Sequence, residues 1–313
     1  MLRLIGTRLL VGIPVIFLAS TFAFFLVEFV PGSPAQFILG NTATPENTAV
    51  LNKQLGLDKP LIIQYLTWIS KAVRGDFGQS YITNTSVADT LGNSLPPTLS
   101  LALIAILVVF IGGQALGLLA AVYSGPLDRA VQAVSNIFMA IPNFWLASIL
   151  VLVFALKVGV FPATGYTALT DSPSAWALGL VLPVIAISAA FLAQVVMQAR
   201  ASALDVMGRD FVRTLQATGV PRRTIILKHV LRNAAIPVTT VSGLIFIFLL
   251  SGAVVVEYTF NIPGVGSLMV NSVTRHDLPV VQGAIVYFSV AVVIVNIAVD
   301  ILAAWLNPRI RIS

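Results

Sequence analysis

The sequence predicts an all-α integral membrane protein that crosses the bilayer six times. The chain is 58% hydrophobic and only 10% charged, whereas soluble domains carry about 25% charged residues. Six apolar stretches are each long enough to cross a hydrocarbon core, which takes about 20 helical residues. Lys and Arg are concentrated in alternate loops. The excess apolar surface is therefore expected to face lipid.

The first apolar stretch covers residues 9–30 and follows Arg3 and Arg8, as the apolar region of a signal peptide would. That region is usually about 7–15 residues long, and this stretch is clearly longer. We expect an uncleaved first transmembrane helix within residues 1–31.

Residues 32–93 form a large, charge-balanced segment between the first and second spans. Helical spacing predicts an amphipathic helix over residues 61–73, with Leu61, Tyr65, Trp68 and Ile69 on one face. We expect a small folded cap outside the membrane.

Residues 94–306 contain the other five spans and are expected to form the transmembrane core, followed by a short tail at 307–313. A backbone in lipid must satisfy its own hydrogen bonds, so helices are expected. Gly113 and Gly117 form a small-xxx-small face in the second span, which is expected to let another helix approach closely. Pro142 and Pro183 fall within the third and fourth, where they either permit bending or mark static kinks, the simpler interpretation. The five spans are 98–123, 131–156, 176–198, 236–256 and 280–306.

The distribution of charge predicts the orientation. Twelve of the 18 Lys and Arg residues lie at the two termini, at Arg129 and in the loop after the fourth span. Cytoplasmic loops carry the excess of positive charge. Both termini and this loop are therefore expected in the cytoplasm. The net positive charge is expected to contact anionic lipid headgroups, and no nucleic acid partner is expected.

Enzyme motifs are missing from the sequence. There is no G-x-x-x-x-G-K-[ST] phosphate loop, so this chain is not expected to hydrolyse ATP. It has no cysteine, and its two histidines, His229 and His276, are expected on opposite sides of the membrane. We expect no catalytic residues, no metal site and no cofactor in this chain.

The loop at residues 208–237 has the most defined pattern. Apolar residues recur at helical spacing at Phe211 and Leu215, and again from Ile225 onward. Gly219 suits the end of a helix and Pro221 the start of the next. The pattern predicts two short amphipathic helices meeting at a tight turn. The alternative is a basic loop that lies on anionic lipid. A defined turn favours a folded protrusion that fits a groove in a partner protein.

This loop resembles the coupling motif of type I ABC importer permeases at Ala217, Gly219, Ile225 and Pro237. Leu215-Gln216 departs from the acidic residue and alanine that the broader family often has there. The resemblance covers nearly the whole chain and narrows to the dipeptide/oligopeptide/nickel subfamily, the DppB/OppB type. Its other matching blocks are 55–60, 64–65, 74–80, 95–99, 142–147, 161–166, 256–266, Asn296, Asp300 and 307–309.

The resemblance implies a subunit of an ATP-driven importer in the bacterial inner membrane. Such a permease pairs with a sister permease, docks its loop on one or two ATPase subunits that hold ATP and Mg, and receives substrate from an extracytoplasmic binding protein. The residues then expected to couple to the ATPase are Asp210, Phe211, Arg213, Leu215, Ala217, Gly219, Val220, Pro221, Arg222, Ile225 and His229.

Three polar residues in or beside the spans are candidates for the substrate pathway or a gate. Asp300 follows Asn296 by one helical turn, and pairing with a basic cytoplasmic residue is favoured over contact with substrate. Glu257 either attracts a substrate ammonium group or anchors the loop that follows it, and the sequence leaves both open.

Di- and oligopeptides are the expected substrates. Nickel complexes, glutathione or haem are the alternatives within the same assembly, and the lack of thiol or paired imidazole groups disfavours bare nickel. An ion-coupled secondary transporter is the alternative of another class. It would be expected to show a paired repeat and several charged residues at mid-membrane, which this sequence lacks.

Overall fold

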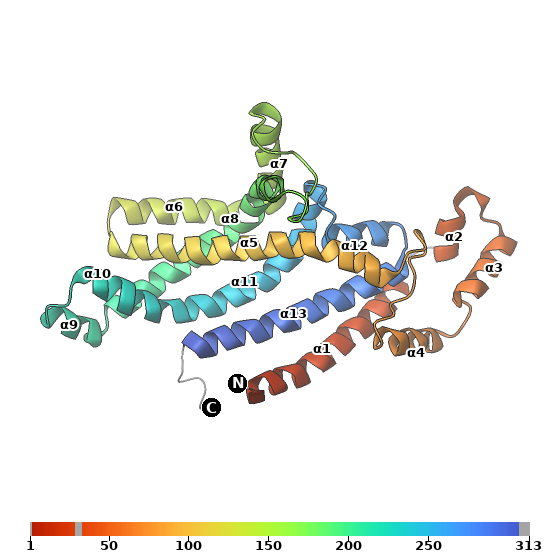
Figure 1. The fold of residues 1–313 in the computed structure, drawn as a ribbon, viewed down its shortest axis with the longest axis horizontal. Helices are drawn as coiled ribbons and strands as arrows, with labels where there is room; N and C mark the ends of the chain where they lie inside the picture. Colours follow the sequence, from red (N-terminus) through yellow and green to blue (C-terminus); the bar gives the residue numbers. More distant parts are fainter. Residues whose placement is uncertain (1, 29–32, 307–313) are drawn as a thin grey trace. The chain divides into compact units, whose positions relative to one another are not determined.

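The computed structural model describes residues 2–28 and 33–306, and this part of the chain is almost entirely helical (Figure 1). A single antiparallel bridge, Gln79 with Ser86, is the only β-pairing in it. The helices are α1 (Leu2–Glu28), α2 (Pro34–Leu39), η1 (Gly40–Thr42), α3 (Pro45–Leu55), α4 (Leu61–Ala72), α5 (Val87–Val122), α6 (Pro126–Ala140), α7 (Asn143–Leu150), η2 (Val151–Lys157), α8 (Pro173–Met207), α9 (Asp210–Ala217), α10 (Arg222–Thr224), η3 (Ile225–Val230), α11 (Leu231–Thr259), α12 (Val265–Thr274) and α13 (Leu278–Leu306).

Four helices of the described chain are long and apolar enough to cross a membrane. They are α5, α8, the continuous helix Arg222–Thr259 and the stretch Leu278–Ala298 of α13. A fifth span exists if α6 and the helix after it, Asn143–Lys157, are counted together. In α1 the described apolar stretch Leu9–Phe25 is shorter than these spans. The structure thus supports four or five spans, and the count of six stays a prediction.

The third predicted span is not one continuous helix. The expectation of a single helix over residues 131–156 is wrong, because α6 ends at Ala140 and the chain bends by 100° before it continues from Asn143. Pro142 supplies the physical reason. It lacks an N–H and disfavours helical geometry in the residue before it. Ile141 accordingly has extended backbone angles, with φ −82° and ψ 124°.

The chain divides into two compact units, one of which comprises residues 98–262 and the end of α13 from residue 295. In this unit α8 packs against α6, α7 and α11. It also lies close to α5 at the predicted small-residue face. A Cβ added at Gly117 would lie 2.6 Å from the Ala199 Cβ and from the Val196 carbonyl oxygen. The prediction of close helix approach there is confirmed.

The other unit comprises residues 2–97 and 263–294. The predicted amphipathic helix is confirmed as α4, with Leu61, Tyr65, Trp68 and Ile69 turned away from solvent. Tyr65 is buried against α1, where its ring lies 5.3 Å from that of Phe24. That residues 32–93 lie outside the membrane stays a prediction. A second cluster of this unit joins α5, α12 and α13 through Val87, Leu91, Val265, Val280 and Ala284.

Candidate functional site

The predicted turn exists and closes helix α9. Gly219 has φ +78°, in the left-handed region that glycine adopts without strain. The N–H of Val220 donates to the Leu215 carbonyl at 3.1 Å, and the N–H of Gly219 donates to the Gln216 carbonyl at 3.1 Å. These two bonds define a Schellman motif. The prediction that Gly219 ends a helix is therefore confirmed.

The helix after the turn is longer than expected. Pro221, with φ −58° and ψ 135°, precedes α10 as predicted. The chain then continues through α10, the π-helix η3 and α11 as one 38-residue helix, Arg222–Thr259. The expectation of a second short helix is wrong, since Pro237 lies within the long helix without ending it. We call residues 209–230 the knob, and we call the continuous helix Arg222–Thr259 the rod. The second half of the knob is the start of the rod, and the rod is long and apolar enough to be a membrane span.

The knob has its own apolar core. Val212, Ile225 and Val230 are buried, and Leu215 and Val220 pack against the same cluster. The neighbouring elements contribute Leu118 and Ala121 from α5, Ala203, Val206 and Met207 from α8, and Ala234 from α11. Leu215 and Val220 both pack against this cluster, and they occupy the two positions whose apolar side chains often accompany a Schellman motif. The turn is therefore held by packing as well as by its hydrogen bonds.

The coupling candidates divide into an inward and an outward set. Leu215, Val220 and Ile225 face the core, and His229 is half-buried. The others form the exposed tip: Asp210, Phe211, Arg213, Ala217, Gly219, Pro221 and Arg222. Sequence reasoning chose Phe211 for the apolar face, but Phe211 is 37% exposed and its neighbour Val212 is 2% exposed. The three-residue spacing of Val212 and Leu215 was the signal that could have identified the buried position.

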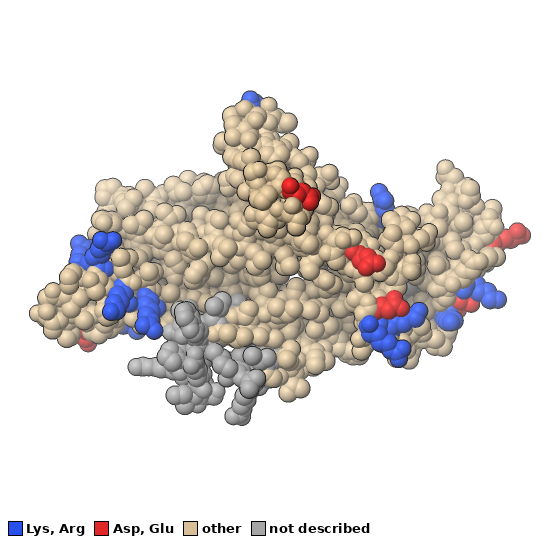
Figure 2. All heavy atoms as spheres, in the orientation of Figure 1, with Lys and Arg blue, Asp and Glu red and all other residues tan. Residues whose placement is uncertain are grey.

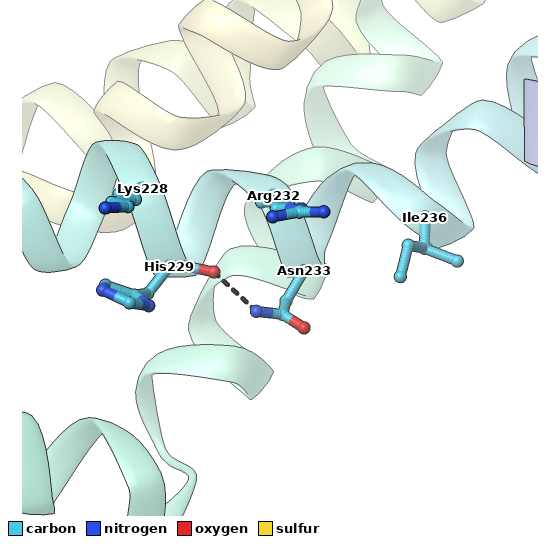
Figure 3. A pocket seen from close by; sticks show the side chains of 5 residues that line it. All are labelled: Lys228, His229, Arg232, Asn233 and Ile236. Carbon is cyan, nitrogen blue, oxygen red and sulfur yellow. Dashed lines mark hydrogen bonds between the residues drawn. The ribbon is translucent and has the colours of Figure 1, made fainter. Parts of the chain in front are cut away.

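The knob and the start of the rod are strongly basic. No Asp or Glu occurs between Asp210 and Glu257, while Arg213, Arg222, Arg223, Lys228 and Arg232 lie in that interval. Basic side chains gather near α10 and the start of the helix that follows it in the space-filling view (Figure 2). One group lines an open cavity of about 280 Å³, formed by Lys228, His229, Arg232, Asn233 and Ile236 (Figure 3). The Asn233 amide nitrogen donates to the His229 carbonyl at 2.7 Å, one turn earlier in the same helix.

A bidentate ion pair supports the helix that leads into the knob. On α8, Arg200 places its Nε 2.5 Å from Asp128 Oδ1 and its Nη2 2.6 Å from Asp128 Oδ2, on α6. The Gln132 amide also donates to Asp128, at 2.9 Å. Two parallel bonds fix direction as well as distance. Sequence reasoning missed this pair because the partners lie 72 residues apart.

The three pathway candidates lie in different surroundings. Glu257 is fully buried and accepts a hydrogen bond from the Thr98 hydroxyl at 2.6 Å, and its backbone carbonyl accepts the N–H of Ile262 at 2.8 Å. This supports the anchoring role over contact with substrate. Asn296 is exposed on α13, and the side chain of Asp300 lies outside the described residues. No group of three or more His, Asp or Glu side chains that could hold a metal occurs in the part of the chain that is described.

Comparison with known families covers both halves of the chain. The family described as the binding-protein-dependent transport system inner membrane component matches residues 113–312. The N-terminal family of the membrane component of the same systems matches residues 1–102. Together these matches cover almost the whole sequence.

Curated relatives match over nearly their full length. A putative peptide transport system permease protein of Brucella abortus (strain 2308) is 35% identical over 312 residues, covering 99% of both chains. The glutathione transport system permease protein GsiC of Escherichia coli (strain K12) is 40% identical with the same coverage.

A solved structure shares the fold. It is an inward-facing conformation of the MetNI methionine ABC transporter, with a TM-score of 0.57 and 17% identity, covering 69% of this chain and 96% of that chain. The chain therefore belongs to the binding-protein-dependent transport system inner membrane components and is a DppB/OppB-like permease subunit of a type I ABC importer.

Proposed function

We propose that this permease imports short peptides, forms half of the translocation pathway with a sister permease, and transmits ATP-driven motion through its knob. ATP and Mg would be bound by separate ATPase subunits, and an extracytoplasmic binding protein would deliver the substrate. The names of the two relatives support a peptide substrate, since one is a peptide system and glutathione is itself a tripeptide. Glutathione as the specific substrate, nickel complexes and haem are the alternatives within the same assembly, whereas the family match leaves the ion-coupled alternative without support.

The observation that carries the coupling role is the continuity between the knob and a membrane span. At the tip Ala217, Gly219 and Pro221 are exposed, while the core beneath them is packed against α5 and α8. Hydrogen bonds between successive turns keep the length of a helix nearly fixed at about 1.5 Å per residue. A rigid element of this kind therefore transmits a displacement from one end to the other. A push on the tip would therefore be carried directly into the helix Arg222–Thr259.

The proposal includes the orientation. The excess of Lys and Arg supports a cytoplasmic position for both termini and the knob. In this arrangement residues 32–93 lie outside, on the side from which a binding protein would dock. The transmembrane core would then comprise residues 94–306, with the tail 307–313 inside.

Substitution of Gly219 tests the coupling role. Gly219→Arg places a bulky cation on the exposed tip and costs about 1–2 kcal/mol in the left-handed region. We expect normal insertion, loss of peptide uptake, and ATP hydrolysis that no longer responds to the loaded binding protein. The permease purified alone is expected to hydrolyse no ATP.

Gly159→Arg is the matched control for strain and bulk. Gly159 has φ +70°, and like Gly219 it has no atom within 4 Å of an added Cβ. It lies between η2 and α8, away from the knob. Uptake of labelled di- and tripeptides, with glutathione as competitor, is the measurement. Normal uptake by Gly219→Arg, or an equal loss in Gly159→Arg, would contradict the coupling role.

A further inference from the structure

A second cavity opens beside the knob, between the end of α5 and the start of the rod. Its volume is about 420 Å³, and we call it the arginine groove. Its lining consists of Leu118, Leu119, Val122, Tyr123, Arg222, Arg223, Ile226 and Leu227.

The floor of this groove is apolar and open. Leu119 is 46% exposed and Leu227 is 50% exposed, so a strip of aliphatic side chains is left uncovered by the chain. Tyr123, which directly follows α5 in the chain, also lines the groove and is exposed. Tyrosine is enriched where hydrocarbon meets headgroups. The floor therefore has the composition of a surface that contacts acyl chains near the membrane boundary.

The rim of the groove is cationic. Arg222 donates from Nη2 to the Val122 carbonyl at 3.3 Å, which holds its guanidinium at the edge of the apolar strip. Arg223 follows it directly and is exposed. Neither arginine forms an ion pair with a described carboxylate. The groove therefore presents two positive charges at one edge and no negative charge in its lining.

We propose that the arginine groove binds one anionic phospholipid. The phosphate lies against Arg222 and Arg223, and an acyl chain lies along Leu119, Val122 and Leu227. Guanidinium groups match phosphate oxygens in charge and in hydrogen-bond geometry. Basic pockets between transmembrane helices on the cytoplasmic side are typical sites for acidic lipid headgroups.

The other basic cavity of the rod lacks this combination. Lys228, His229 and Arg232 line it together with Asn233, and Ile236 is its single aliphatic residue (Figure 3). It has the charge for a phosphate but no floor for an acyl chain. The two cavities lie on the same helix and differ mainly in that floor, so Lys228 and Arg232 provide a matched control.

The test uses the assembled transporter in a non-ionic detergent, titrated with phosphatidylglycerol and followed by native mass spectrometry. Phosphatidylcholine with the same acyl chains is the neutral comparison. We expect one tightly bound phosphatidylglycerol per permease. Each cation near an anionic lipid surface changes affinity by about fivefold, so Arg222→Gln with Arg223→Gln should weaken binding about 30-fold. Lys228→Gln with Arg232→Gln removes the same charge and should leave that affinity within about threefold.

Three results would overturn the proposal. An equal loss of phosphatidylglycerol affinity in the two double variants would show that the lipid is attracted to positive charge in general and not to this groove. Displacement of the lipid by soluble glycerol phosphate would show a phosphate site with no use for the apolar floor. Unchanged lipid binding in the Arg222/Arg223 variant, together with loss of the ATPase subunits on purification, would assign these arginines to a protein contact. None of these readouts depends on peptide uptake, so the lipid site and the proposed transport function fail separately.

Discussion

The contact of α5 with α8 at Gly117 leads to a quantitative prediction. A Cβ at this position would lie 2.6 Å from both Ala199 Cβ and the Val196 carbonyl oxygen, and 2.8 Å from the Arg200 nitrogen. Favourable contacts between carbon atoms begin near 3.5 Å. Two of the three obstructing atoms belong to the backbone of α8 and cannot rotate away. Gly117→Ala therefore forces the two helices apart by roughly 1 Å.

The expected cost is about 1–3 kcal/mol, as for other overpacked interfaces. It is partly offset, because alanine favours a helix over glycine by about 0.5–1 kcal/mol. Gly92→Ala isolates the packing contribution. Gly92 lies on the same helix, and an added Cβ there meets nothing within 4 Å. Both variants gain the same helix propensity, so the difference in unfolding free energy between them is the packing cost alone, about 1–3 kcal/mol.

The assay is thermal unfolding of the purified transporter carrying each variant. We expect Gly92→Ala to keep or raise the melting temperature and Gly117→Ala to lower it by several degrees relative to Gly92→Ala. Adding Ala199→Gly to Gly117→Ala should recover only part of the loss, because the contacts with Val196 and Arg200 persist. Equal melting temperatures for the two alanine variants would refute the close approach of α5 and α8.

Two further predictions concern buried carboxylates. Glu257→Gln keeps an oxygen that accepts a hydrogen bond from the Thr98 hydroxyl, so this variant should retain peptide uptake. Glu257→Ala removes that oxygen and should lower the stability of the protein. Loss of uptake in a stable Glu257→Gln protein would assign the charge of Glu257 a role in transport. Ser80→Ala removes the 2.5 Å bond to buried Asp277 and should cost about 1.5–3 kcal/mol by thermal unfolding. Thr83→Ala removes an exposed bond in the same loop, and an equal loss there would show that burial of Asp277 is irrelevant.

Local backbone chemistry made the turn of the knob predictable from the sequence. Gly219 needed a positive φ and Pro221 could only begin a helix, and neither requirement depends on distant residues. The helix at Leu61–Ala72 was predictable for a related reason, since one apolar face sets both its period and its burial.

Two prolines show where sequence reasoning fails. Pro142 breaks its helix by 100°, while Pro183 lies buried inside α8 without ending it. Both lack an N–H, so the local cost is the same. Pro183 is buried by the neighbours of α8 whereas Pro142 is exposed, so the two prolines differ in tertiary packing, which local sequence pattern does not show.

The ion pair of Arg200 with Asp128 was unpredictable for the same kind of reason. Arg200 served in the sequence only as one positive charge among several in its loop. Its partner lies on another helix, and the pairing follows from the approach of α6 to α8. Tertiary contact, not spacing along the chain, creates this feature.

The π-helix at Ile225–Val230, which is the last part of the knob, sets the rotational phase between the turn at Gly219 and the helix that continues from Leu231. A π-turn spaces its hydrogen bonds over five residues instead of four. One residue corresponds to about 100° of rotation about the axis of an α-helix. Ile225 and Val230, the first and last residues of this segment, and Ala234 beyond it are all buried in one cluster. Loss of one residue here would shorten the knob by that residue and would turn every side chain from Leu231 to Thr259 onto a different face. In the proposed coupling role, this segment would set which face of the following helix a push at the tip moves.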